Sequence, residues 1–157
     1  MELKQYLIDT FKFNDYANKL VLKKIKELPE KDEAINLFSH IINAQNKWLA
    51  RILQDLDAHT MSPWNPVYNL DELEIKWNES LKKWIDFLES KSEEELFEEI
   101  LFIAVDGEKW HTILKDIPLQ LNYHSIHHRA QIQSIIRKQG LKPDTVDYIV
   151  TLYKKIE

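Results

Sequence analysis

The chain has 157 residues, of which 44% are hydrophobic and 30% charged. This balance is typical of a soluble globular protein, and the length predicts one domain over residues 1–157. Cysteine is absent, which excludes disulfides, iron–sulfur clusters and thiolate metal sites, so any metal would be held by His, Asp, Glu or water. The net charge of -5, without a basic stripe or tail, argues against nucleic acid as a partner.

Neither a targeting segment nor a membrane span is expected. Residues 1–19 carry charges throughout and lack the apolar stretch of a signal peptide. The longest strongly apolar run, Ile100 to Val105, is far shorter than the roughly 20 residues that a membrane-spanning helix needs. We therefore expect a cytoplasmic protein that does not bind membranes.

The first half of the chain predicts two long helices followed by a loop. Apolar residues recur at helical spacing over residues 3–28, where Pro29 ends the pattern, and again over about 32–57. Two prolines then break the periodicity, so residues 59–69 are expected to form a loop. We expect this loop to pack over another part of the protein, with Trp64 as the residue that walls a pocket or a dimer contact.

A third helix and a hairpin are predicted next. The helix begins at Asn69, and Glu72 has the spacing of a capping box. Ser92 is expected to cap a further short turn. The pair Asp106-Gly107 lies between two segments rich in β-branched and aromatic residues, which predicts a two-stranded ribbon over about 100–113.

A fourth long helix is predicted over residues 116–139, ending at Gly140. Residues 144–157 are expected to form a short helix, although their Val and Ile content also permits a strand. The predicted fold is therefore all-α: a four-helix bundle with a small β-hairpin insertion between the third and fourth helices. The apolar stripes place four of the five tryptophans in the core: Trp48, Trp77, Trp84 and Trp110.

Histidines are concentrated in the fourth helix, in the stretch LNYHSIHHRAQIQ. His124 and His128 are four residues apart on the predicted buried face, so both imidazoles can reach one ion. His127 points about 100° away from that face. Buried imidazoles need partners for their nitrogens, and a metal ion would supply one. The alternative to a metal site is that these histidines form hydrogen bonds with other groups of the core, because the spacing of His124 and His128 alone is a weak signal of metal binding.

A third ligand should come from a facing helix. His40 lies at the edge of the apolar stripe of the second helix and is the best candidate. His59 and His111 are expected to be surface or packing residues. The sequence thus predicts a metal site of His40, His124 and His128, and no catalytic residue can be assigned from it.

Three stretches, LFSHIINAQNKWLARI, NYHSIHHRAQI and GLKPDTVDYI, together resemble the DinB / YfiT-like family of metal-dependent proteins, in the right order and over nearly the whole chain. The family's pattern in this helix is a histidine, three further residues, a histidine followed by an arginine, one further residue and a glutamine. In this sequence the named residues of that pattern are His124, His128, Arg129 and Gln131. Its first metal histidine, which precedes a Trp and an Arg, corresponds to His40, with Trp48 and Arg51. Two positions depart from the family's pattern: Tyr16 and Ala130.

This resemblance implies a homodimeric four-helix bundle whose three histidines bind a divalent metal, commonly zinc or nickel. Some relatives are S-transferases that use a low-molecular-weight thiol. The leading hypothesis is therefore a metal-dependent transferase of the thiol S-transferase type, or a hydrolase, that acts on a small molecule. The alternatives are a non-catalytic, stress-related bundle that binds a metal or small ligand, and a purely structural bundle without metal.

Several polar residues, most of them near the predicted ligands in the sequence, are candidates for contacts with the site. Asp15 is considered for a position facing the site, and Arg129 is expected to form a surface ion pair. Hydrogen bonds to the metal ligands are considered, alongside ordinary packing or solvation, for four residues: Asn43, Gln45, Asn122 and Tyr123.

Overall fold

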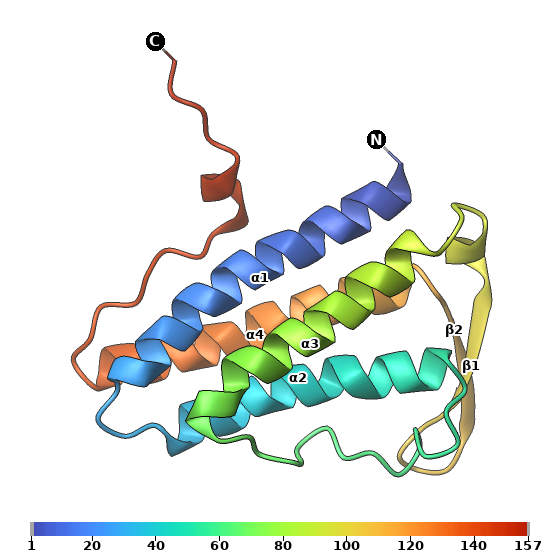
Figure 1. Ribbon diagram of the computed structural model, residues 1–157, viewed down its shortest axis with the longest axis horizontal. Coiled ribbons are helices and arrows are strands. Elements are labelled where there is room, and N and C mark those ends of the chain that lie inside the picture. The colour runs from blue at the N-terminus through green and yellow to red at the C-terminus, as the bar shows by residue number, and fades with distance from the viewer. Residues whose placement is uncertain (1, 157) are drawn as a thin grey trace.

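The computed structural model describes residues 2–156, which form four long helices and one two-stranded sheet (Figure 1). The prediction of an all-α four-helix bundle with a β-hairpin between the third and fourth helices is confirmed. The long elements are α1 (Leu3–Glu27), α2 (Asp32–Ile52), α3 (Leu70–Glu89), β1 (Glu99–Ile103), β2 (Lys109–Ile113) and α4 (Asp116–Lys138). Within residues 2–156, no helix is both long enough and apolar enough to cross a membrane.

The four helices enclose one hydrophobic core. α1 packs against α3 and α4, and α2 packs against the same two helices, so α1 and α2 lie diagonally across the bundle. The core is built from the apolar stripes that the sequence predicts, and its largest members include Phe11, Phe38, Trp77 and Trp84, each fully buried. The indole N–H groups of the two tryptophans are satisfied, because they donate to Asp15 and to the backbone oxygen of Gln45.

α2 and α3 run in the same direction, which makes the connection between them long. After α2 the chain returns along the bundle to the end where α2 began, and α3 starts there (Figure 1). α2 has 21 residues and is about 30 Å long at 1.5 Å per residue. The loop 53–69 must cover this length, so it passes over the side of α2.

α2 ends at Ile52, five residues before the predicted end at Asp57. Gln54 has a φ of 56°, a left-handed conformation that ends a right-handed helix. Leu56, whose spacing extends the predicted apolar stripe, is 88% exposed. The apolar pattern therefore continues past the point at which the backbone turns.

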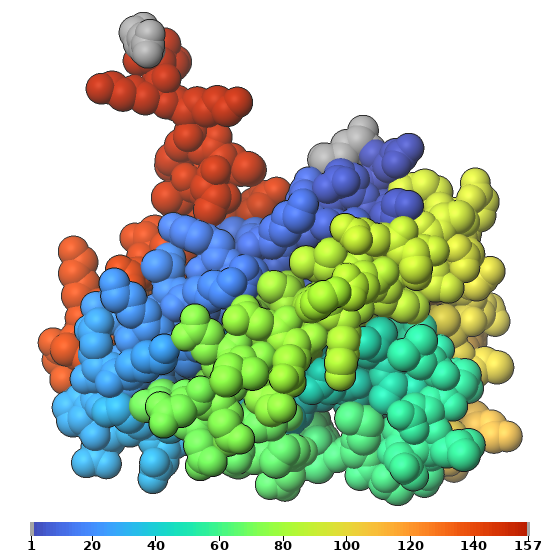
Figure 2. All heavy atoms as spheres, in the orientation of Figure 1, coloured from blue at the N-terminus to red at the C-terminus, as the bar shows by residue number. Residues whose placement is uncertain are grey.

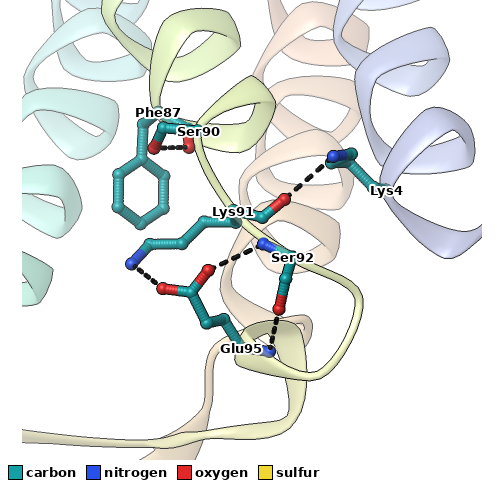
Figure 3. A network of polar contacts seen from close by, with 6 residues as sticks. All are labelled: Lys4, Phe87, Ser90, Lys91, Ser92 and Glu95. Carbon is teal, nitrogen blue, oxygen red and sulfur yellow. Dashed lines mark hydrogen bonds and ion pairs between the residues drawn. The ribbon is translucent and has the colours of Figure 1, made fainter.

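The start of α3 and the turn after it follow their predicted capping residues. Asn69 N–H donates to Glu72 Oε2 at 3.0 Å, as the capping box requires. After α3, Ser92 and Glu95 bond reciprocally, each accepting from the backbone N–H of the other (Figure 3). Lys4 of α1 donates to the carbonyl oxygen of Lys91 at 2.9 Å. A short turn follows Ser92 as predicted, and it continues into a 3-10 helix, Glu95–Phe97; the preceding Lys91 ties this segment to α1.

The hairpin closes one end of the bundle, with β1 against α2 and β2 against α4. Its turn contains Gly107, whose φ is +83°, as the Asp-Gly pair predicts. Phe102 and Trp110 face each other across the two strands. The prediction that Trp110 lies in the core is wrong: it is 53% exposed, because the two-stranded ribbon has no second layer over its outer part. Trp48 is partly buried against the core.

α4 ends near the predicted Gly140, which has a φ of +83°. The chain then passes α1, and the last described residues, up to 156, stand away from the bundle (Figures 1 and 2). The helix or strand predicted over 144–157 is found only as a 3-10 turn, Tyr148–Thr151. The ring of Tyr148 packs edge-on against Phe13, with 5.0 Å between centroids, and Val146 packs against the core, so these side chains attach the segment to the bundle.

Candidate metal centre

Three histidines from two neighbouring helices meet between α2 and α4. His40 Nε2 lies 2.9 Å from His124 Nε2, and His128 Nε2 lies 3.0 Å from the same atom. One nitrogen from each ring lies within 4.8 Å of the other two. His40 and His128 are buried, at 6% and 8% exposed, and His124 is half-buried. These are the three residues proposed from the sequence as metal ligands.

The other three histidines lie apart from this cluster. His127 is exposed and meets His128 only edge-on, with 4.9 Å between ring centroids. His59 and His111 are also exposed. Helix geometry explains the separation on α4, because residues four apart share a face and adjacent residues point about 100° apart.

Outward hydrogen bonds fix the orientation of two of the three imidazoles. His40 Nδ1 lies 2.7 Å from the carbonyl oxygen of Pro63, and His128 Nδ1 lies 2.7 Å from Gln131 Oε1. A carbonyl oxygen can only accept, so both Nδ1 atoms carry the proton. In the neutral rings, Nε2 of His40 and of His128 is then a lone pair that faces the cluster.

These lone pairs make the cluster a good fit for a metal ion. His124 Nε2 can carry one proton at most, yet it faces lone pairs on two sides at about the same distance. Nitrogen ligands around a tetrahedral ion lie about 3.3 Å apart when the metal–nitrogen bonds are about 2.0–2.1 Å. Two of the three spacings, 2.9 and 3.0 Å, are close to this value, and all three ligand atoms lie within 4.8 Å of one another. Outward Nδ1–H bonds to carbonyl groups are also the usual support for histidine metal ligands.

Burial keeps the three imidazoles neutral, which is the form that binds metals. The pKa of His124 is lowered to about 4, mainly by desolvation and to a lesser extent by the neighbouring His128 and His40. Burial is also the main cause that lowers the pKa of His40 and of His128. The bonds to Pro63 and Gln131 act in the opposite direction but do not reverse these shifts.

The loop between α2 and α3 covers part of the cluster, in line with the expectation that it packs over another part of the protein. The Trp64 ring stacks on His40, with 3.7 Å between centroids and 10° between planes. Lys47 and Asn43 hold the loop in place by donating to the carbonyl oxygens of Met61 and Pro66. Trp64 remains 45% exposed, so its outer face forms part of the protein surface above the histidines.

A cavity of about 240 Å³ adjoins the cluster, and His40 and His124 form part of its wall. The rest of its lining comes from the face of α2, from the start of α4, from the loop at Pro63 and from the hairpin turn at Val105. Ligand pockets of drug-sized molecules have about 300–1,000 Å³. This cavity therefore suits a smaller molecule beside the histidines.

The polar residues weighed for contacts to the metal ligands bond elsewhere. Asn43 bonds to the loop and to Tyr68, Gln45 to Ser80, and Asn122 to Thr10 and Pro118. Tyr123 is 63% exposed. Asp15 accepts from Trp77 and pairs with Lys19, so it does not face the cluster.

The prediction of a surface ion pair for Arg129 is wrong. Arg129 is 2% exposed and its Nη1 donates to Asn14 Oδ1 at 2.6 Å, Asn18 Oδ1 at 2.7 Å and Ser125 Oγ at 3.3 Å. Burial lowers its pKa to about 10. The physical reason is that α4 is buried on two sides: His128 faces α2, while the next residue faces α1 and meets two asparagine oxygens there.

Two of the groups that orient the histidines were not assigned from the sequence. Gln131 follows His128 by three residues, which places the two on the same side of a helix, so its role could have been proposed. The carbonyl of Pro63 is a backbone group that any residue could supply, and no side-chain pattern marks it.

The sequence model described as the DinB family matches residues 7–157. No curated protein matches the chain. The matched residues include the three clustered histidines, the loop 53–69 between α2 and α3, and the hairpin between α3 and α4.

Replacing Arg129 by leucine is expected to destabilise the fold by about 3 kcal/mol, because the oxygens of Asn14 and Asn18 would lose a charged donor inside the core. Chemical denaturation measures this loss. Arg137→Gln is the control: Arg137 is an exposed cation on the same helix, and its loss should change stability by less than about 0.5 kcal/mol. Equal effects in the two variants would contradict the assignment.

Proposed function

The chain belongs to the DinB family, and we propose on this premise that it binds a divalent metal ion, zinc or nickel, through His40, His124 and His128. One observation carries the proposal: outward hydrogen bonds leave the Nε2 lone pairs of His40 and His128 directed at a third imidazole. Without a cation among the rings, His124 Nε2 could donate its one proton to only one of these lone pairs, and the other would stay unsatisfied in a largely buried place, which is unfavourable.

We further propose that the protein is a metal-dependent transferase of the thiol S-transferase type, or a hydrolase, acting on a small molecule. A divalent ion held by three neutral imidazoles supplies acidity, since it lowers the pKa of a bound water to about 7 or binds a thiol as its thiolate. The cavity beside His40 and His124 supports this proposal because it offers room for a small substrate next to the three nitrogens.

The chain's own residues would orient and shield the reacting groups. Pro63 and Gln131 hold His40 and His128 in one tautomer and one orientation. Trp64 lies flat on His40 and keeps water from that side of the ring. The turn of the hairpin, through Val105, forms part of the cavity wall.

A non-catalytic protein that binds a metal or a small ligand is the second candidate. It is favoured by the lack of a carboxylate that could act as a general base among the cavity-lining residues of the described chain. A turnover screen separates the two candidates: metal-loaded protein is offered several low-molecular-weight thiols, each with a small electrophile. Consumption of both reactants that requires the metal supports the transferase, and metal binding without turnover of any pair supports the second candidate. A homodimer stays a prediction from the family, which sedimentation would test.

Metal analysis of protein purified without a histidine tag tests the proposed ligands. About one divalent ion per chain is expected, and alanine at His40, His124 or His128 should remove most of it because two imidazoles hold an ion poorly. His127→Ala is the matched control, since that ring belongs to the same helix but lies outside the cluster. Full metal content in the His40→Ala and His128→Ala proteins would exclude the proposed site.

Gln131→Leu should weaken metal binding by about 10–100-fold without abolishing it, because His128 loses the acceptor that orients its ring. Competition with a metal-binding dye measures the affinity. Gln133→Leu makes the same change two residues further along α4, where the side chain bonds to the backbone of Asp144 instead. If both variants bind the metal as the parent does, Gln131 has no role in the site.

A further inference from the structure

One face of α2 combines a histidine of the cluster with two cations. His40, Ala44, Lys47 and Arg51 are spaced by four, three and four residues and therefore lie on one side of the helix. All four line the cavity beside the histidines. A ligand in this cavity would thus contact the metal cluster at one end and a lysine and an arginine at the other.

Arg51 is held rigidly but its charge is not neutralised. Its guanidinium lies 4.7 Å from the centre of the Trp48 ring and 4.9 Å from that of Phe102. Its one side-chain hydrogen bond within residues 2–156 is a long contact of 3.4 Å from Nη2 to the carbonyl oxygen of Ile103. Nε is buried and has no hydrogen-bond partner among the described residues. The aromatic rings therefore position a guanidinium whose donors are largely unused.

Lys47 is 5% exposed and donates to the carbonyl oxygen of Met61 at 2.6 Å. Burial lowers the pKa of its ammonium group, and the charge of Arg51 lowers it further. The two cations are thus close enough to repel each other. Several other lysines, by contrast, pair with a nearby Asp or Glu, as Lys19, Lys24 and Lys91 do.

No acidic residue of the described chain offsets these two charges in the cavity. Its lining contains neither Asp nor Glu, and neither Lys47 nor Arg51 takes part in an ion pair within residues 2–156. A buried charge without a counterion costs free energy. The chain carries 26 acidic and 21 basic residues, so the missing counterion does not reflect a shortage of carboxylates.

We propose that the substrate of the histidine site is a small carboxylate, whose anionic group binds to Lys47 and Arg51 while its reacting part faces the three histidines. This inference rests on the proposed function, because it takes the histidine cluster as the reaction centre. The planar guanidinium, fixed by two rings, is suited to a planar carboxylate.

The remaining lining limits the size and character of the ligand. Trp48, Leu121 and Val105 supply apolar surface in the same lining, and the cavity holds about 240 Å³. A compact hydrocarbon or aromatic body with one carboxylate matches this combination. Benzoate is a suitable probe, and benzamide is its uncharged counterpart of nearly the same shape.

The test compares the binding of benzoate and benzamide to metal-free protein, followed by calorimetry. Removing the metal excludes direct coordination of the carboxylate as the cause of a preference. The parent is expected to bind benzoate about tenfold more tightly than benzamide, or better. Lys47→Met and Arg51→Gln should each lose most of this preference, and Arg51→Lys should retain part of it.

Arg137→Gln is the matched control, because it removes one positive charge from an exposed position on α4 and should leave the preference unchanged. Circular dichroism checks that each variant is folded. If Arg51→Gln does not fold, Lys47→Met and the weakening of benzoate binding at high salt carry the test. The inference is overturned if the parent does not bind benzoate, if it binds both probes equally, or if the preference survives in the folded variants.

The same preparations separate this inference from the proposed function. If the parent binds the metal but shows no preference for benzoate, the carboxylate assignment is overturned and the proposed metal site is still supported. A benzoate preference that depends on Lys47 and Arg51, in a protein that binds no metal, supports the anion site and contradicts the proposed metal centre.

Discussion

The hydrogen bond from His40 Nδ1 to the carbonyl oxygen of Pro63 fixes which nitrogen of His40 faces the other two histidines. A backbone carbonyl cannot donate, so the ring must turn its lone pair inward. This carbonyl reaches His40 because α2 and α3 are parallel and the chain has to return along the bundle between them (Figure 1). The topology of the bundle thus determines the tautomer of a side chain at its centre, and Trp64, the next residue of the loop, covers the same ring.

The rotation of α4 about its axis is a second constraint on the fold, because this helix carries buried polar groups on two sides. His128 faces α2, and Arg129 faces Asn14 and Asn18 of α1. Ser125, one turn earlier, joins the arginine network. Each of these groups has a partner on a neighbouring helix, so α4 can be buried only in one rotation about its axis. A rotation that moved His128 away from α2 would also separate Arg129 from its oxygens, and the two networks therefore stabilise the same arrangement.

Much of this arrangement follows from local sequence rules, and the exceptions have a common cause. Periodicity, the capping residues at Asn69 and Ser92, and the glycine turn at Gly107 gave most boundaries, because each depends on neighbours along the chain. The end of α2 was misplaced because a left-handed Gln54 carries no sequence signal while the apolar spacing continues to Leu56. Arg129 was assigned to the surface because a single apolar stripe implies one buried face, whereas α4 has neighbours on two sides. The carbonyl of Pro63 and the exposure of Trp110 likewise depend on contacts between distant segments.

The cluster and the cavity beside it are built by different parts of the chain. Helix packing alone brings His40 to His124 and His128, since α2 and α4 are neighbours. The cavity also depends on two connections between helices. The loop 53–69 contributes Pro63 to its wall, and the hairpin contributes Val105. The hairpin also positions Arg51 through Phe102. β1 is tied to the end of α2 because Leu101 and Ile103 accept hydrogen bonds from Gln54 and Arg51.

Connections between elements accept changes in sequence and length more readily than packed helices do. A change in the loop or the hairpin would therefore alter the shape of the cavity, whose wall includes Pro63 and Val105, while the helices kept the three imidazoles together. In this bundle, the helices bring the three imidazoles and the two cations together, and the loop and the hairpin set the tautomer of His40 and the shape of the cavity.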